Sequence, residues 1–234
     1  MVNLFNYVYN YSSMCRIDHR IKYCAKLIGK AKWILDIGSG NSPYRKIFDY
    51  ENYISADIEH YPEVDVICDA TSLPFDNGKF DAIICTEVLE HLEAPEKALC
   101  EISRVLKPGG YLITSIPFMF GKHTRYDYVR WSDLGIKKLL NNHSLNIIWI
   151  ENRGKIFSMM AELVRQLPAE LLGPFSRDSN NFFKYGILFL YYLLIIPITI
   201  LLRNMDNYVK NDNITIGYIL IGQKEEILDV QKTD

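Results

Sequence analysis

Short apolar runs alternate with helix-compatible stretches along the first two thirds of the chain. The runs lie at 33–37, 53–56, 64–68, 80–85 and 111–116, and LNIIWIEN at 145–152 adds a sixth. Short buried strands that are separated by helices are typical of a parallel sheet with helices on both faces. The pattern therefore predicts an α/β fold.

Helix signals fall between these runs. Ile17, Ile21, Cys24 and Ile28 have helical spacing in the stretch before the first strand. Residues 95–105 begin on a proline, which favours the first helical turn, and should end before the Pro-Gly-Gly turn at 108–110. Ser132 is a typical N-cap for a helix that begins after it.

Acidic residues close four of the predicted strands. Asp36, Asp57 and Asp69 end or follow the first three runs, and Thr86-Glu87 follows the fourth. Buried strands exclude carboxylates that lack a partner, and ligands of parallel sheets bind at the carboxyl ends of the strands. The four acids therefore predict a ligand site at this edge of the sheet.

The loop after the first strand narrows the choice of ligand. Gly38-Ser39-Gly40 allows close approach of the backbone, but a dinucleotide fingerprint would need a third glycine where the chain has Pro43. Asp36 beside the loop would repel a pyrophosphate and suits a cation such as an amino-acid ammonium.

The next two acids suit the rest of such a ligand. Asp57 is placed for two ribose hydroxyls, and Asp69, next to Ala70, could accept a hydrogen bond from an exocyclic adenine amine. A ligand with an ammonium, a ribose and an adenine but no phosphate is S-adenosylmethionine.

Six ordered motifs give the chain a family resemblance. They are ILDIGSG at 34–40, ISADIE at 54–59, CDATSLPF at 68–75, FDAIICTEVLEHL at 80–92, ISRVLKPGGYLITSIPF at 102–118 and ITIGYILIGQK at 214–224. With them the chain resembles the class I S-adenosylmethionine-dependent methyltransferases. The resemblance implies a Rossmann-like, seven-stranded, mostly parallel sheet whose last strand is antiparallel and lies between the fifth and sixth. Asn41 stands where the family often has a third glycine.

The resemblance also implies a division of labour among the residues. The methyl donor would be held by Asp36, Gly38, Ser39, Gly40, Asp57, Ile58, Asp69, Ala70, Thr86 and Glu87. The loop after the fifth strand, HTRYDYVRWS from 123 to 132, would form the acceptor pocket, with Tyr126, Asp127, Tyr128 and Arg130 as acceptor-binding candidates.

A hydroxyl acceptor must lose a proton as it attacks, so a general base is expected. His123 and His91 are the candidates. Structural alternatives exist for three of the assignments: His91 could bond backbone, Asp127 could pair with Arg130, and Asp69 could cap a turn.

The acceptor class follows from a finer resemblance. Pro43-Tyr44-Arg45 after the glycine loop, together with His123 and the DYVR segment at 127–130, is similar to enzymes associated with sugar or cell-envelope pathways. We therefore expect a small or lipid-linked acceptor, with saccharides and cell-envelope precursors as candidates. The alternatives are a non-catalytic binding module that kept the fold and a nicotinamide-dependent oxidoreductase, which Pro43 disfavours.

An apolar segment interrupts the expected domain. We expect an N-terminal helical cap at 1–30, the sheet core at 31–154, a helical apolar insert at 155–212, the final strand at 213–225 and a tail at 226–234. Within the insert, 185–202 contains no charged residue, and as a helix it would span roughly 27 Å, close to the thickness of a bilayer core.

A membrane crossing is not expected from this segment. Both ends of the insert must return to one sheet, and Pro197 should break the run into two short helices. The remaining interpretations are a hydrophobic lid, a homodimer face, or peripheral or monotopic membrane contact through 180–204. We favour membrane contact.

Composition limits the partners and the compartment. The net charge of −2 gives no electrostatic case for nucleic acid. The five cysteines include no CxxC pair, which argues against a metal site and for free thiols in a reducing compartment. With no signal-peptide pattern at the N-terminus, we expect a cytoplasmic protein, peripheral to the inner face of the membrane.

Overall fold

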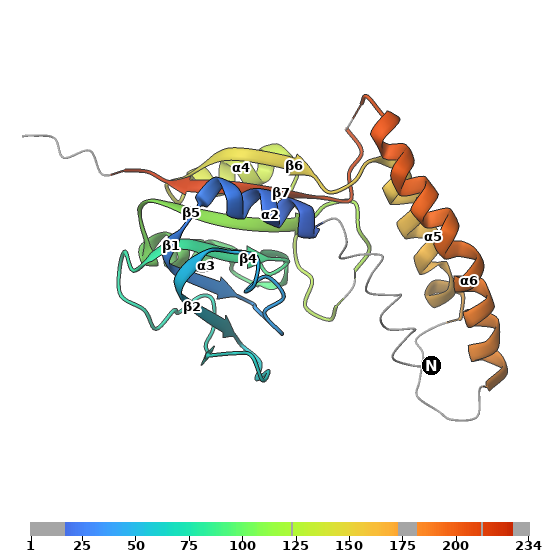
Figure 1. The fold of residues 1–234 in the computed structure, drawn as a ribbon, viewed down its shortest axis with the longest axis horizontal. Helices are drawn as coiled ribbons and strands as arrows, with labels where there is room; N and C mark the ends of the chain where they lie inside the picture. The colour runs from blue at the N-terminus through green and yellow to red at the C-terminus, as the bar shows by residue number, and fades with distance from the viewer. Residues whose placement is uncertain (1–16, 123, 173–181, 212, 227–234) are drawn as a thin grey trace, which may run out of the picture. The chain divides into compact units, whose positions relative to one another are not determined.

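The computed structural model describes residues 17–122, 124–172, 182–211 and 213–226 (Figure 1). The chain divides into two compact units. One consists of Asp18–Glu151 and Gly217–Asp234 and holds the sheet; the other consists of Met1–Ile17 and Asn152–Ile216 and holds a pair of long helices. His123, residues 1–16 of the expected N-terminal cap and most of the expected tail lie outside the described residues.

A seven-stranded sheet organises the first unit, in the order β3-β2-β1-β4-β5-β7-β6. Its parallel pairs are β1 with β2, β1 with β4, β2 with β3 and β4 with β5, whereas β7 pairs with β5 in antiparallel orientation. The Rossmann-like, mostly parallel sheet is thus confirmed, with the last strand between the fifth and the sixth. The strands are β1 Ala31–Ile37, β2 Tyr50–Asp57, β3 Val66–Ile67, β4 Phe80–Thr86, β5 Leu106–Pro117, β6 Leu145–Asn152 and β7 Gly217–Lys224.

The central strands contain apolar runs because they lie in the core. Ala82–Cys85 of β4 are completely buried, as are Ile34 and Leu35 of β1. Helix α3 (Pro95–Val105) packs against this core with Leu99 and Ile102. Burial of this kind, rather than strand propensity alone, fixes which runs become interior strands.

The expected turn at 108–110 lies inside a strand instead. β5 begins at Leu106 and continues to Pro117, and its pairing with β4 is irregular: Phe80 pairs with Leu106, but Ala82 pairs with Tyr111. The extra residues on β5 form a bulge. A Cβ on Gly110 would lie 2.9 Å from the backbone oxygen Lys107 O, so a larger residue would clash with the backbone of the bulge.

The helices of the sheet unit follow the sequence signals. α2 spans Ile17–Ile28, α3 begins on its proline as expected, η1 is a single turn at Leu89–His91, and α4 spans Asp133–Asn141. The Ser132 hydroxyl accepts a hydrogen bond from Gly135 N at 3.2 Å, which confirms it as the N-cap of α4.

The second unit contains two long helices, α5 (Ile156–Leu172) and α6 (Phe182–Met205), followed by the single turn η2 (Asp206–Tyr208). The prediction that Pro197 divides the apolar run is wrong, because α6 passes through it without a break. A proline removes one backbone donor, and the packing of α6 against α5 is retained on both sides of it. Before Pro197, the Tyr192 hydroxyl donates to Arg165 O of α5 at 3.2 Å, and after it, Arg203 donates to Glu162 Oε2 of α5 at 3.3 Å.

Within the described ranges, no helix combines the length and the sustained hydropathy that a bilayer crossing requires.

Candidate active site

The acids predicted at the strand ends share one edge of the sheet. Asp36 is the penultimate residue of β1, Asp57 is the last residue of β2, Asp69 follows β3 and Glu87 follows β4. Because these four strands are parallel neighbours, their carboxyl ends lie on the same side, where ligands of such sheets bind.

Asp36 is enclosed rather than open to solvent. Its exposed fraction is 2%, and its Oδ2 accepts a hydrogen bond from the Tyr53 hydroxyl at 2.7 Å. Burial raises the pKa of Asp36 from 3.8 to about 7, although the Tyr53 hydrogen bond and the Arg45 charge oppose that rise. Burial deprives the ionised Asp36 carboxylate of water, so a cation bound next to it would stabilise the negative charge.

The glycine loop takes a conformation that other residues resist. Gly38 and Gly40 have φ of 65° and 49°, and a Cβ on Gly38 would lie 2.3 Å from Val88 Cγ2. Ser39 N donates to Ala56 O at 3.2 Å, which ties the loop to β2. The Ser39 hydroxyl is buried and has no hydrogen-bond partner among the described residues.

Asp57 joins the loop to the end of β2. Its Oδ2 accepts from Gly40 N at 2.9 Å, and its Oδ1 accepts from Glu59 N at 3.0 Å. The side chain of its neighbour Ile58 is exposed. A carboxylate offers about four lone-pair sites, so Asp57 keeps acceptor capacity for hydroxyl groups while it orients the loop.

Asp69 shows the contacts of the turn-capping alternative. Its Oδ1 accepts from Thr71 N at 2.7 Å and from Thr71 Oγ1 at 2.8 Å, and the residue is exposed, whereas Ala70 is buried. These bonds form an Asx turn. Only Ala70 of this pair belongs to the core.

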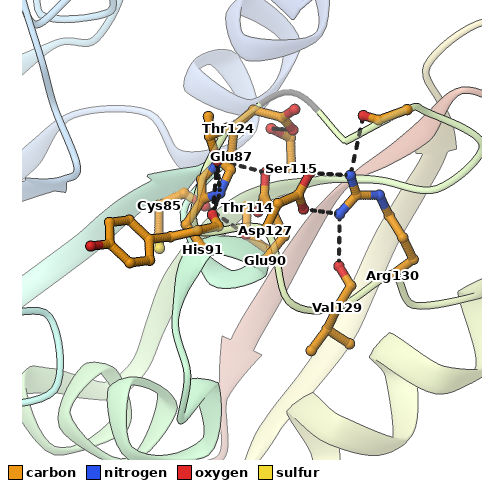
Figure 2. A network of polar contacts seen from close by, with 12 residues as sticks. Cys85, Glu87, Glu90, His91, Thr114, Ser115, Thr124, Asp127, Val129 and Arg130 are labelled. Atoms are coloured by element: carbon orange, nitrogen blue, oxygen red, sulfur yellow. Dashed lines mark hydrogen bonds and ion pairs between the residues drawn. The ribbon is translucent and has the colours of Figure 1, made fainter.

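Glu87 follows Thr86, the last residue of β4, and has a strained backbone with φ of 53°. Its N donates to Ser115 O at 3.0 Å, and the Ser115 hydroxyl donates to Glu87 Oε1 at 2.8 Å (Figure 2). Two bonds from β5 therefore hold a conformation that is sparsely populated elsewhere and tends to occur at functional sites.

His91 forms a hydrogen bond with the backbone of the loop that follows β5. Its Nδ1 lies 2.5 Å from Tyr126 O, and because a carbonyl only accepts, Nδ1 carries the hydrogen. Thr124 Oγ1 donates to the same carbonyl at 2.8 Å, next to His91 (Figure 2). Tyr128 N donates to Glu90 O at 2.8 Å. His91 therefore makes the backbone hydrogen bond of the structural alternative. If it also acts as a base, Nε2 is the nitrogen that would accept the proton, and this atom lies 3.7 Å from Glu90 Oε1.

Arg130 forms a bidentate ion pair with Asp127. Its two terminal nitrogens donate to the two carboxylate oxygens of Asp127, one at 2.7 Å (Figure 2), and it also donates to Val129 O at 3.0 Å. The Asp127 side chain is 1% exposed. The two residues thus form the loop-shaping ion pair of the structural alternative, and Tyr126 and Tyr128 are exposed. Acceptor binding by these four residues stays a prediction.

A protein-family model matches the part of the chain that carries the acids at the strand ends. Residues 35–114, from β1 into β5, match the family model described as a methyltransferase domain. These residues are a methyltransferase domain.

Relatives and solved structures agree with that domain. Over 55 residues the chain is 46% identical to a demethylmenaquinone methyltransferase of Renibacterium salmoninarum, covering 23% of each protein. Over 95 residues it is 34% identical to the tRNA (carboxymethyluridine(34)-5-O)-methyltransferase of Arabidopsis thaliana, covering 36% of this chain and 23% of that protein. The chain thus spans about a quarter of the length of the curated relatives it matches.

A solved structure supports the fold over a longer range. The 1,6-didemethyltoxoflavin-N1-methyltransferase of Burkholderia thailandensis, solved with S-adenosylhomocysteine bound, has a TM-score of 0.55 and 13% identity, covering 88% of this chain and 77% of its own. At this identity the likeness concerns the fold of the methyltransferase domain.

Sequence reasoning missed two residues that position others in this site. Tyr53 supports Asp36, and Ser115 supports Glu87. One signal for Tyr53 existed: Ser55 pairs with Asp36 in the register, and Tyr53, two residues earlier, has the same side-chain direction on β2. That signal becomes readable only when the register is known.

The Asp127–Arg130 pair yields a stability prediction. Arg130→Met leaves the Asp127 carboxylate buried without its bidentate partner, and we expect a loss of about 3 kcal/mol in the free energy of unfolding. Urea denaturation measures it. Arg125→Met, an exposed arginine in the same loop, is the matched control and should cost under about 0.5 kcal/mol. Equal losses in the two variants would contradict the assignment.

Proposed function

We propose that the chain is an S-adenosylmethionine-dependent methyltransferase. One observation carries the proposal: a buried carboxylate, Asp36, stands behind a glycine loop that Asp57 orients through Gly40 N, inside a methyltransferase domain. The residues present fit a cationic nucleoside. Asp36 favours positive charge, and the partnerless Ser39 hydroxyl offers a buried polar contact in the same loop.

Two parts of the donor have residues of this chain that would hold them. Asp36 and the Gly38–Gly40 loop would take the amino-acid end, and Asp57 would take the ribose hydroxyls with its remaining lone pairs. When bound, the donor supplies an activated sulfonium methyl group. The work left to the protein is alignment of an acceptor and removal of its proton.

We further propose a small or lipid-linked acceptor, with saccharides and cell-envelope precursors as candidates. The support is the loop after β5, which presents the exposed rings of Tyr126 and Tyr128 while His91 and the Asp127–Arg130 pair fix its backbone. Exposed aromatic rings next to fixed polar groups suit a ligand with both apolar and hydroxyl faces. Free Cys24 and Cys85 accord with the cytoplasm.

Two measurements test the proposal in sequence. Calorimetric titration with S-adenosylmethionine should show binding, and the absence of binding would overturn the proposal. Incubation with a methyl-labelled donor and fractionated cell extract should then transfer label to one fraction. Binding of the donor without transfer to any fraction would favour the non-catalytic alternative.

Substitution of His123 tests whether this residue is the general base that takes the proton from the acceptor. His123→Ala should leave the Kd for the donor unchanged and lower turnover by about 100-fold, the usual contribution of a general base. Turnover on the identified fraction is the measurement, and His143→Ala, in the turn after α4, is the control. Unchanged turnover in the His123 variant would dismiss it as the base.

A further inference from the structure

Helices α5 and α6 carry charged side chains between them. Glu162 Oε1 accepts from Arg165, and Glu162 Oε2 lies 3.3 Å from Arg203 Nη2 of α6. Glu162 and Arg165 are buried, and Arg203 is largely so. This charged cluster therefore lies on the faces by which the two helices pack together.

Polar groups also close the base of the hairpin. The buried Asp206, directly after α6, accepts from Lys155 N at 2.8 Å and from Phe157 N at 3.0 Å, at the start of α5. Lys155 Nζ donates to Val209 O at 2.7 Å. The chain thus enters α5 and leaves α6 at the same end of the hairpin.

The outward faces of both helices are apolar. Leu163 is 61% exposed and lies two residues, or about 200° of rotation, from the buried Arg165; Leu194 is 68% exposed and has the same relation to the buried Tyr192. The other exposed apolar side chains of these faces are Met160, Leu167 and Leu171 on α5 and Leu190, Leu193, Ile198, Ile200, Leu201 and Met205 on α6.

In this hairpin, charged side chains lie between the helices and apolar side chains face outward. A water-soluble hairpin has the reverse arrangement, with its apolar stripes facing inward. Of the charged side chains that the structure describes in the two helices, none is exposed. A second copy or a protein partner would cover one side of the hairpin. Apolar faces on two opposite sides, with ionised groups paired in the interior, match the arrangement that lipid imposes on helices.

We infer that the α5–α6 hairpin inserts into the surface of a lipid bilayer and returns to the same side. The common base formed by Lys155 and Asp206 keeps both ends together, and the lipid covers the two outward faces. The inference does not depend on methyl transfer. Because the outward faces carry apolar groups, neutral lipid should be sufficient for binding.

Vesicle flotation tests the inference with the full-length chain. The protein should float with neutral phosphatidylcholine vesicles, and 0.5 M salt should leave the bound fraction unchanged. The double variant Leu163→Glu/Leu194→Glu should lose at least about tenfold in the bound fraction, since each change places a charge in hydrocarbon. Leu134→Glu, a 72% exposed leucine on α4, is the matched control and should still float. Circular dichroism checks that all variants are folded.

A second readout separates lipid from a protein occupant. Leu163→Trp and Leu194→Trp, made separately, should both show added fluorescence that brominated phosphatidylcholine quenches. Quenching at one position alone, flotation only with anionic vesicles, or a concentration-dependent dimer in ultracentrifugation that the glutamate pair abolishes without any flotation would each overturn the inference.

Discussion

Gly38→Ala is expected to destabilise the chain by about 3 kcal/mol and to weaken donor binding by at least about 100-fold. The new Cβ would lie 2.3 Å from Val88 Cγ2, and φ of 65° adds a second cost. Left-handed backbone costs about 1–2 kcal/mol for a residue with a Cβ, and overpacking costs about 1–3 kcal/mol more. Relief of the clash must move the loop or Val88, and misplacement of about 1 Å can cost a factor of about 100.

Urea denaturation and calorimetric titration measure the two effects, and a second glycine separates their causes. Gly78 has nearly the same φ, 63°, but a Cβ there would meet no atom within 4 Å. Gly78→Ala should therefore show the backbone cost of about 1–2 kcal/mol alone and leave donor affinity intact. If both variants lose the same stability and neither loses affinity, the close packing of loop and Val88 has no functional meaning.

Asp36→Asn is expected to weaken donor binding by about 10–100-fold, the loss that accompanies removal of a hydrogen bond to a charged group. The wild-type affinity should also depend on pH. With a pKa of about 7, Asp36 is mostly protonated at pH 5.5, so affinity for a cationic donor should rise about tenfold between pH 5.5 and pH 7. The variant should show no such rise, and a parallel rise in both proteins would reject Asp36 as the ammonium partner.

The stability of the wild-type fold should fall as pH rises, whereas its affinity for the donor should rise. The folded-state pKa of Asp36 is raised above its ordinary value of 3.8, so the fold prefers the neutral carboxyl. Its contribution to stability is present below pH 4 and is lost as pH rises through 7. Asp36→Asn remains neutral, and above pH 7 it should be more stable than wild type by about 2–4 kcal/mol. Urea denaturation at pH 5 and pH 8 measures this, with exposed Asp49→Asn as the control.

The sequence was sufficient for the strands and for the sheet edge that carries the acids. The apolar runs that became β1 and β4 are buried on both faces, and burial on both faces leaves an unambiguous apolar pattern. The helix over 95–105 and its successor were marked by Pro95 and Ser132, whose effects are local. Such features depend on neighbours in the chain, which a sequence displays directly.

Features that depend on contacts between distant segments were harder to predict. The tie between His91 and Tyr126 joins residues 35 positions apart, and the sequence could only pose it as an alternative to catalysis. Tyr53 and Ser115 act through strand register. Pro197 was misjudged because propensity predicts a break, whereas packing of α6 against α5 maintains the helix.

Nascent chains of this protein complete their sheet late. β7 is the final strand in the sequence, yet it lies between β5 and β6. During synthesis, β5 and β6 emerge from the ribosome well before their shared neighbour, so one edge of β5 stays without a partner strand until Lys224 has been translated. The α5–α6 hairpin precedes β7 in the chain and has emerged by then. Translation therefore exposes the apolar hairpin to its surroundings before the seven-stranded sheet is complete.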